Sequence, residues 1–113
     1  MKETILLVYC TVANQDEAKS IANTLIEKKL AACCNIMPSI HSIYCWNEGE
    51  VEESEESLMM IKTTQKRYDQ LEKEIKMIHS YSVPEIIATK LETGSSAYID
   101  WIIGCLDKQG GEI

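Results

Sequence analysis

The sequence predicts an α+β fold, with a four-stranded sheet, two helices packed on one of its faces and a further helix at the C-terminal end. Three observations predict this fold. Strand-like apolar runs and segments of helical periodicity follow one another in the order β-α-β-β-α-β-α. A turn-forming stretch joins the second and third strands directly. The first six elements therefore match the split βαβ, or ferredoxin-like, arrangement.

The first strand and the first helix open the chain. Residues 3–12 are rich in β-branched and apolar side chains, which is typical of a buried strand. Asn14 is followed by Glu17 at the spacing of a capping box, so a helix is predicted to begin after Asn14. Apolar residues then recur at the period of one helix face, namely Ala18, Ile21, Ala22, Leu25 and Ile26.

A long hairpin follows. Residues 33–46 and 51–63 are predicted as its strands, joined by the turn Asn-Glu-Gly-Glu at residues 47–50. Pro38 cannot donate to a strand ladder, so it predicts a bulge or an edge position for the second strand. Six glutamates lie between positions 48 and 56. A solvated hairpin tip explains them most simply, because a patch for divalent cations would lack the loop geometry of an EF-hand.

The second half of the chain repeats the pattern. Thr64 is predicted to cap a second helix, and residues 85–92 are predicted as the fourth strand. The apolar face of that helix comprises Tyr68, Leu71, Ile75 and Ile78. Residues 94–96 (Gly-Ser-Ser) then break the chain and begin a terminal helix. Its predicted inward face comprises Tyr98, Ile99, Ile102, Ile103 and Leu106.

The composition is that of one globular domain, spanning residues 1–113. The net charge of −7 and the isoelectric point near 4.8 argue against nucleic-acid binding, which needs basic patches. No apolar run reaches transmembrane length. Residues 4–8 merge into a strand pattern without the cleavage region of a signal peptide. We therefore expect a cytoplasmic protein that does not insert into membranes.

Five cysteines lie at positions 10, 33, 34, 45 and 105. An odd number without regular spacing does not predict a disulfide framework, and no Cys-x-x-Cys pair is present. Cys33 and Cys34 are adjacent on a strand, so they are expected to point to opposite faces. Reduced thiols in a cytosolic protein, mostly serving as small core residues, are the expectation.

The third strand predicts self-association. Leu58, Met59, Met60 and Ile61 run without alternation, and a strand that is apolar on both sides is buried on both sides. The two crossover helices can cover only one face of the sheet. A domain of this size has nothing left to cover the other face, so an oligomer is predicted.

The connection from the second helix to the fourth strand carries the most chemistry. It places an imidazole (His79), a phenol (Tyr81) and a carboxylate (Glu85) on a short loop. Pro84 biases the residue before it toward an extended conformation, which stiffens the loop. Loops on a rigid scaffold often carry binding chemistry, although a polar connector with a solvated His and Glu is an equally good interpretation of the loop alone.

Several short motifs, in order, resemble those of the CutA divalent-ion-tolerance proteins along nearly the whole chain. They are Cys10-Thr11 followed by Asp16-Glu17-Ala18, the stretch 30–36 (Leu-Ala-Ala-Cys-Cys-Asn-Ile), the stretch 42–49 with Tyr44, Trp46 and Gly49, the Ile61-Lys62-Thr63 strand end, the stretch 79–86 (His-Ser-Tyr-Ser-Val-Pro-Glu-Ile) and Tyr98-Ile99-Asp100-Trp101. Two departures are visible. Ser80 stands where that family usually has proline, and the hairpin tip is one residue longer.

The resemblance implies a homotrimer of ferredoxin-like subunits, similar in shape to the PII signalling trimers, and it implies divalent-metal binding, copper in particular. Cys10 and Cys33 match positions where the family carries cysteines linked to copper. Thiolate and imidazole suit copper, so His79 is the expected nitrogen donor and Glu85 an oxygen donor. For both cysteines, a role as core residues is the competing interpretation.

Three functions from different classes remain open. The first is a non-enzymatic trimeric metal-binding protein, copper-type, acting in metal-ion tolerance or homeostasis. The alternative is a PII-like signalling or scaffold trimer that binds a small metabolite or a protein partner in clefts between subunits, although the sequence has no glycine-rich phosphate loop. The third is an enzyme with a Cys or His nucleophile, and nothing in the sequence supplies a third group to orient the base.

Overall fold

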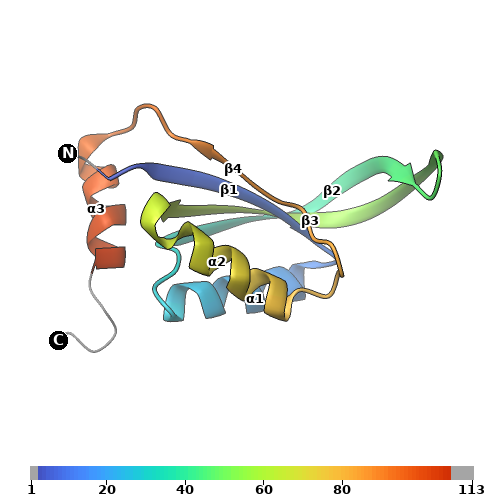
Figure 1. Cartoon of the computed structure of the whole chain (residues 1–113), viewed down its shortest axis with the longest axis horizontal. Helices are drawn as coiled ribbons and strands as arrows, with labels where there is room; N and C mark the ends of the chain where they lie inside the picture. Colours follow the sequence, from blue (N-terminus) through green and yellow to red (C-terminus); the bar gives the residue numbers. More distant parts are fainter. Residues whose placement is uncertain (1–2, 108–113) are drawn as a thin grey trace.

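The structure is a computed structural model in which residues 3–107 are described, so the two ends of the predicted domain 1–113 lie outside the described residues. Seven elements follow one another in the predicted order (Figure 1). They are β1 (Ile5–Val12), α1 (Gln15–Glu27), β2 (Cys33–Trp46), β3 (Glu50–Thr64), α2 (Gln65–Ile78), β4 (Ile86–Lys90) and α3 (Ser96–Asp107). Their bounds differ from the predicted ranges by at most a few residues.

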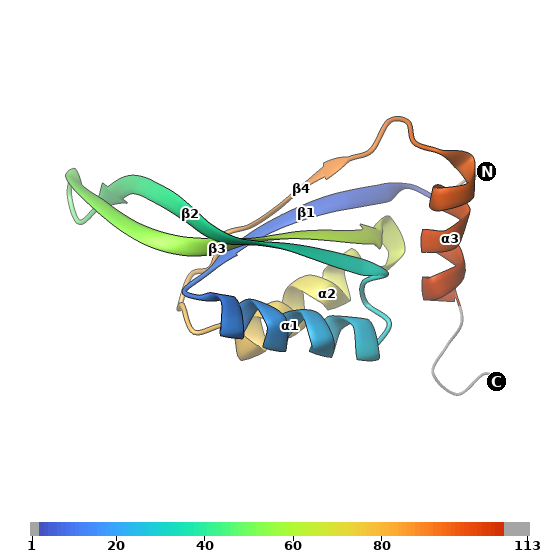
Figure 2. The same cartoon turned by 180° about the vertical axis from the view of Figure 1, so that it is seen from behind.

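The four strands form one antiparallel sheet in the order β2-β3-β1-β4. Helices α1 and α2 lie side by side on one face, and α3 stands at the end of the sheet where β1 begins (Figures 1 and 2). The predicted ferredoxin-like α+β fold with an extra C-terminal helix is therefore confirmed. No helix within residues 3–107 is long and apolar enough to cross a membrane.

The helix starts use two different caps. The Asn14 Oδ1 accepts a hydrogen bond from the Glu17 N–H at 2.8 Å, which confirms the predicted cap of α1. Thr64 occupies the N-cap position of α2 as predicted, but its side chain makes no capping bond. The carboxylate of Glu3 accepts from the Lys66 N–H instead, at 3.3 Å, so the start of the chain closes this helix end.

The hairpin between β2 and β3 projects beyond the helix layer (Figure 1). The register shifts between Met37 and Ile40, so Pro38 marks a bulge in an edge strand as the sequence predicts. The buried Ser57 hydroxyl donates to the Pro38 carbonyl at 2.7 Å and closes the gap in the ladder. At the tip the backbone turns through three residues of positive φ and ends on Gly49 at 97°, where a side chain would be strained.

The core lies between the sheet and α1 and α2. Alternate residues of the central strands β1 and β3 point into it, and the helices supply the facing side chains. Its fully buried members include Val8, Cys10, Val12, Met59, Ile61, Ile21, Leu25, Leu71 and Ile75. Ile26, predicted to point inward, is 40% exposed. Eight residues after Ala18, at 100° per residue, it lies about 80° around the helix from Ala18 and so at the edge of the buried face.

The opposite face of the sheet is apolar and has neither α1 nor α2 on it (Figure 2). The residues that alternate with the core positions point to this side, which we call the open face. Its apolar members are Leu7, Tyr9, Met37, Leu58, Met60 and Ile87, of which Tyr9, Met37 and Ile87 are exposed. Contiguous apolar surface of this kind marks an interaction site.

Two methionines, one buried and one exposed, provide a stability test. Met59 is completely buried in the core, whereas Met77 is 73% exposed on α2. Met59→Ala should lower the free energy of unfolding by about 2–5 kcal/mol, because it leaves a cavity. Met77→Ala should change it by no more than about 0.5 kcal/mol. Denaturant unfolding at one fixed protein concentration measures both, and equal losses would contradict this assignment of the core.

Candidate site at the loop between α2 and β4

His79 ends α2 and is held inside the molecule. Its N–H donates to the Ile75 carbonyl at 2.9 Å, while its own backbone is already extended, so the helix cannot continue. The chain then runs to Pro84, and this loop lies at the end of the sheet where β1 finishes (Figure 1). The side chain of His79 is 0% exposed. The alternative that this histidine is a solvated loop residue is therefore wrong.

Both nitrogens of the His79 ring have partners within the protein. Nε2 lies 2.9 Å from the Thr11 carbonyl oxygen, which can only accept, so Nε2 carries the proton. Nδ1 accepts from the Tyr81 N–H at 3.0 Å. The ring is therefore the neutral tautomer with Nε2 protonated, and it ties the loop to the end of β1.

Ser80 makes up for the missing proline with two hydrogen bonds to α1. Its N–H donates to Glu17 Oε2 at 2.8 Å, and its hydroxyl donates to Glu17 Oε1 at 2.9 Å. A proline at this position has no N–H to give. The same carboxylate lies 3.7 Å from His79 Nδ1. These two hydrogen bonds, which we call the Glu17–Ser80 clamp, fix the loop in place of a proline ring.

Tyr81 ties the loop to the base of the hairpin. Its hydroxyl donates to Glu56 Oε2 at 2.7 Å, and its ring tilts against His79 with centroids 4.8 Å apart. Burial and the bond to the Glu56 carboxylate together raise the pKa of Tyr81 well above its ordinary value. The phenol is therefore a proton donor, and not a proton acceptor, at neutral pH.

Cys10 and Glu85 approach this cluster from β1 and from the end of the loop. The Thr11 hydroxyl donates to Glu85 Oε1 at 3.5 Å. Burial, and then the negative charges of Glu85, Glu17 and Glu56, raise the pKa of the Cys10 thiol to about 12. Cys10 is thus protonated at neutral pH, whereas both nucleophilic attack and metal coordination require the thiolate.

Cys33 lies on the other side of the sheet. Cys34 packs against the same core cluster that contains Cys10, and its neighbour Cys33 points the opposite way, as the sequence predicts. Cys33 pairs with Lys62 on β3, and the Lys62 Nζ lies 3.9 Å from its sulfur. Within one subunit, Cys10 and Cys33 cannot both reach one metal ion.

The predicted set His79, Cys10, Cys33 and Glu85 therefore does not converge on one point. Among residues 3–107, no group of three or more His, Cys, Asp or Glu side chains is arranged to hold a metal. An ion at His79 would have to displace the Tyr81 N–H from Nδ1. The described residues of a single chain, as they stand, do not fit a copper ion.

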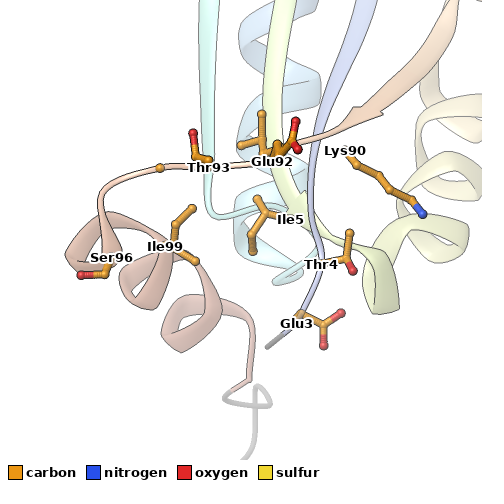
Figure 3. Close-up of a pocket in the computed structure, with 10 residues that line it drawn as sticks. Glu3, Thr4, Ile5, Lys90, Glu92, Thr93, Ser96 and Ile99 are labelled. Carbon is orange, nitrogen blue, oxygen red and sulfur yellow. The ribbon is translucent and has the colours of Figure 1, made fainter. Parts of the chain in front are cut away.

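A pocket lies at the end of the sheet opposite the His79 loop, between the start of β1 and the segment that leads into α3 (Figure 3). It has a volume of about 710 Å³, and Ile5 and Ile99 form its apolar side. Glu3 and Glu92 also line it, and Lys90 points away from α3. This mixed lining does not converge on any one ligand chemistry.

The network around His79 contains residues that the sequence pattern did not assign to it. The sequence placed Glu17 in a helix cap and in a family motif, and Glu56 only among the hairpin glutamates. The geometry brings both to the loop, from α1 and β3. Their neighbours along the chain give no indication of this, because the contacts with Ser80 and Tyr81 cross 63 and 25 residues.

Comparison with known proteins decides the family. Residues 6–104 match the family described as CutA1 divalent ion tolerance protein. The chain belongs to this family. A CutA protein of Thermus thermophilus is 42% identical over 102 residues, which cover 90% of this chain and 95% of the relative. The chloroplastic CutA of Arabidopsis thaliana is 42% identical over 97 residues, but the chain spans only 53% of that protein's length.

Solved structures of CutA1 proteins share the fold closely. The CutA1 of Ehrlichia chaffeensis aligns with a TM-score of 0.87 at 33% identity, covering 94% of this chain and 98% of that one. The CutA1 of Oryza sativa aligns with a TM-score of 0.87 at 40% identity, covering 91% and 94%. Both the fold and the family membership predicted from the sequence motifs are confirmed.

The clamp between Glu17 and Ser80 predicts a dependence of stability on pH. Partial burial alone would raise the Glu17 pKa, but the hydrogen bonds from Ser80 outweigh it and bring the pKa below its ordinary value of 4.5. A carboxylate with a lowered folded-state pKa stabilises the fold above 4.5, and this contribution disappears as the pH falls through the folded-state value. Glu17→Gln should therefore lose less stability on acidification than the parent chain.

Unfolding by denaturant at a series of pH values between about 6 and about 3 measures this difference. Glu27→Gln, on the exposed end of the same helix, is the matched control and should follow the parent chain. Parallel pH curves for Glu17→Gln and the parent chain would contradict the clamp.

The buried position of Cys10 predicts low thiol reactivity. In the native protein Cys10 should react with a maleimide far more slowly than Cys45, which is exposed in the hairpin. After unfolding, both thiols should react at similar rates. Mass spectrometry of timed digests measures this, and fast native labelling of Cys10 would show that the end of β1 opens.

Proposed function

We propose that this chain acts in divalent-ion tolerance as a non-catalytic homotrimer, and that it binds a copper-type ion with donors from more than one subunit. The open face of the sheet is the single observation that carries the trimer. Ile87 is 54% exposed there beside Tyr9, and α1 and α2 lie on the other side. Neighbouring sheets would bury this surface and remove the free edges at β2 and β4.

Membership of the CutA1 divalent ion tolerance family supports a role with metal ions. The separation of the donors supports placement of the metal between subunits, because Cys33 lies on the open face, where another subunit would contribute a further ligand. Thiolate ligands favour the softer, reduced state of copper. Five free cysteines are consistent with the reducing cytoplasm, where we propose the protein acts.

A non-catalytic role is proposed on the chemistry of the two nucleophile candidates. The thiol of Cys10 is protonated at neutral pH, and His79 cannot act as its base because both ring nitrogens already bond to backbone groups. The same observation favours the alternative of a PII-like signalling trimer. A histidine whose nitrogens are engaged is better suited to holding a cleft in shape for a metabolite than to binding an ion.

Light scattering and copper titration test the proposal together. The parent chain should have about three times the 12.8 kDa mass of one chain. Ile87→Glu places a charge on the open face and should break the trimer, whereas Met77→Glu on the helix layer should leave it intact. Calorimetric titration in reducing buffer should then find copper bound by the parent and by Met77→Glu, with binding lost or at least about tenfold weaker for Ile87→Glu.

Each possible result decides between the candidate functions. Equal copper affinity in a monomeric Ile87→Glu chain would contradict a site between subunits. A trimer that binds no copper would remove the metal proposal and leave the signalling trimer. A stable monomer of the parent chain would contradict both.

A further inference from the structure

A thiol and an amine from neighbouring strands lie side by side on the open face. Cys33 at the start of β2 stands directly opposite Lys62 on β3 in the antiparallel register. The Lys62 Nζ lies 3.9 Å from the Cys33 sulfur, and both side chains are half-buried. Because the ladder fixes the register of the two strands, this pair stays together without help from its own contact.

Two further groups complete the surroundings of this sulfur. Tyr98, from α3, lies near it, because the Cys33 side chain, after burial, is among the causes that raise the pKa of the Tyr98 hydroxyl. The side-chain oxygen of Asn35 accepts from the Lys62 ammonium group and, at 3.9 Å, from the Cys33 thiol. Asn35 thereby holds the amine close to the sulfur. Within residues 3–107 the salt bridges do not include Lys62, and its nitrogen contacts Asn35 and Cys33.

We propose that Cys33 and Lys62 form a reversible covalent cross-link when the protein meets a peroxide. The register places the Lys62 amine within 3.9 Å of a sulfur that peroxide can oxidise, so a sulfenic acid formed there has a nucleophile beside it. Hydrogen peroxide is little larger than water, so it can reach a half-buried sulfur even where a neighbouring subunit limits access. The reactivity of this pair does not depend on metal binding.

The chemistry has two balanced steps. First, the Cys33 thiol gives up its proton and its sulfur attacks one peroxide oxygen; the O–O bond breaks, Cys33 becomes a sulfenic acid, and the other oxygen takes up that proton and leaves as water. The sulfur is oxidised by two electrons, and the peroxide is reduced by two. Then Lys62, after losing a proton, attacks the sulfenic sulfur through its nitrogen lone pair, and the hydroxyl group leaves as water. The product has one sulfur–nitrogen bond, and a thiol reductant returns it to free Cys33 and Lys62.

The other three cysteines that lie on strands lack this arrangement. Burial raises the pKa of Cys34 to about 12 and Cys10 is completely buried, so neither offers a ready thiolate. Cys45 is exposed in the hairpin opposite Val51, which has no amine. The cross-link is therefore specific to one strand pair, where it would covalently fix β2 to β3 at the edge of the open face.

Peptide mass spectrometry of peroxide-treated protein tests the proposal. The reduced oligomer is treated with hydrogen peroxide, free thiols are blocked, and the digest is searched for a Cys33 peptide joined to a Lys62 peptide with the loss of two hydrogen atoms. We expect this pair in the parent chain and in Cys34→Ala, and its loss in Cys33→Ala and after treatment with dithiothreitol. Light scattering before and after treatment confirms that each variant keeps the parent's oligomeric state.

Lys62→Arg is the decisive variant because it keeps the positive charge but removes the amine. In Lys62→Arg the Cys33 sulfenic acid should persist, and a sulfenic-acid probe such as dimedone should label it several-fold more than in the parent, with labelling of Cys45 unchanged. Equal dimedone labelling of Cys33 in both proteins, with no linked peptide in the parent, would overturn the proposal. A linked peptide that retains an oxygen atom would contradict the sulfur–nitrogen bond.

Discussion

The antiparallel register between β1 and β3 is the constraint on which the rest of the structure depends. It sets Val8 against Ile61 and Cys10 against Met59 on the helix side, and Tyr9 against Met60 on the open face. Since side chains alternate along a strand, a slip of one residue would exchange the buried core for the exposed face. The same register, extended to β2, brings Cys33 to Lys62 and keeps it away from Cys10.

The loop after α2 depends on this frame at the point where β1 ends. His79 reaches the Thr11 carbonyl only because β1 delivers that carbonyl beside the end of α2. Glu17 and Glu56 then hold the residues that follow His79, from α1 and from β3. Three elements distant in sequence thus meet at one short loop. A fully hydrogen-bonded polar network of this kind is rigid and tolerates little loss, because every buried partner left alone costs desolvation energy.

The two faces of the sheet separate two kinds of chemistry. The helix side and its border hold the protonated thiol of Cys10 and two side chains that already have hydrogen-bond partners, His79 and Tyr81. The open face holds the half-buried Cys33 and Lys62, which lie beside apolar surface suited to another subunit. Reactivity is therefore expected on the side of the molecule where we propose that subunits associate, although the side chains that stand out most in the sequence belong to the other side.

The sequence by itself determined the element order, the Asn14 cap, the bulge at Pro38 and the fold, because these depend on local periodicity and turn chemistry. It also determined that the sheet has a second apolar face, through the unbroken run at Leu58–Ile61. Only the tertiary structure decided which polar groups are partners. Glu17 and Ser80 meet across 63 residues, and both nitrogens of His79 are engaged by backbone atoms that no pattern of residue types reveals. Hydrogen bonds need distances and directions, and those exist only once the strands and helices have packed.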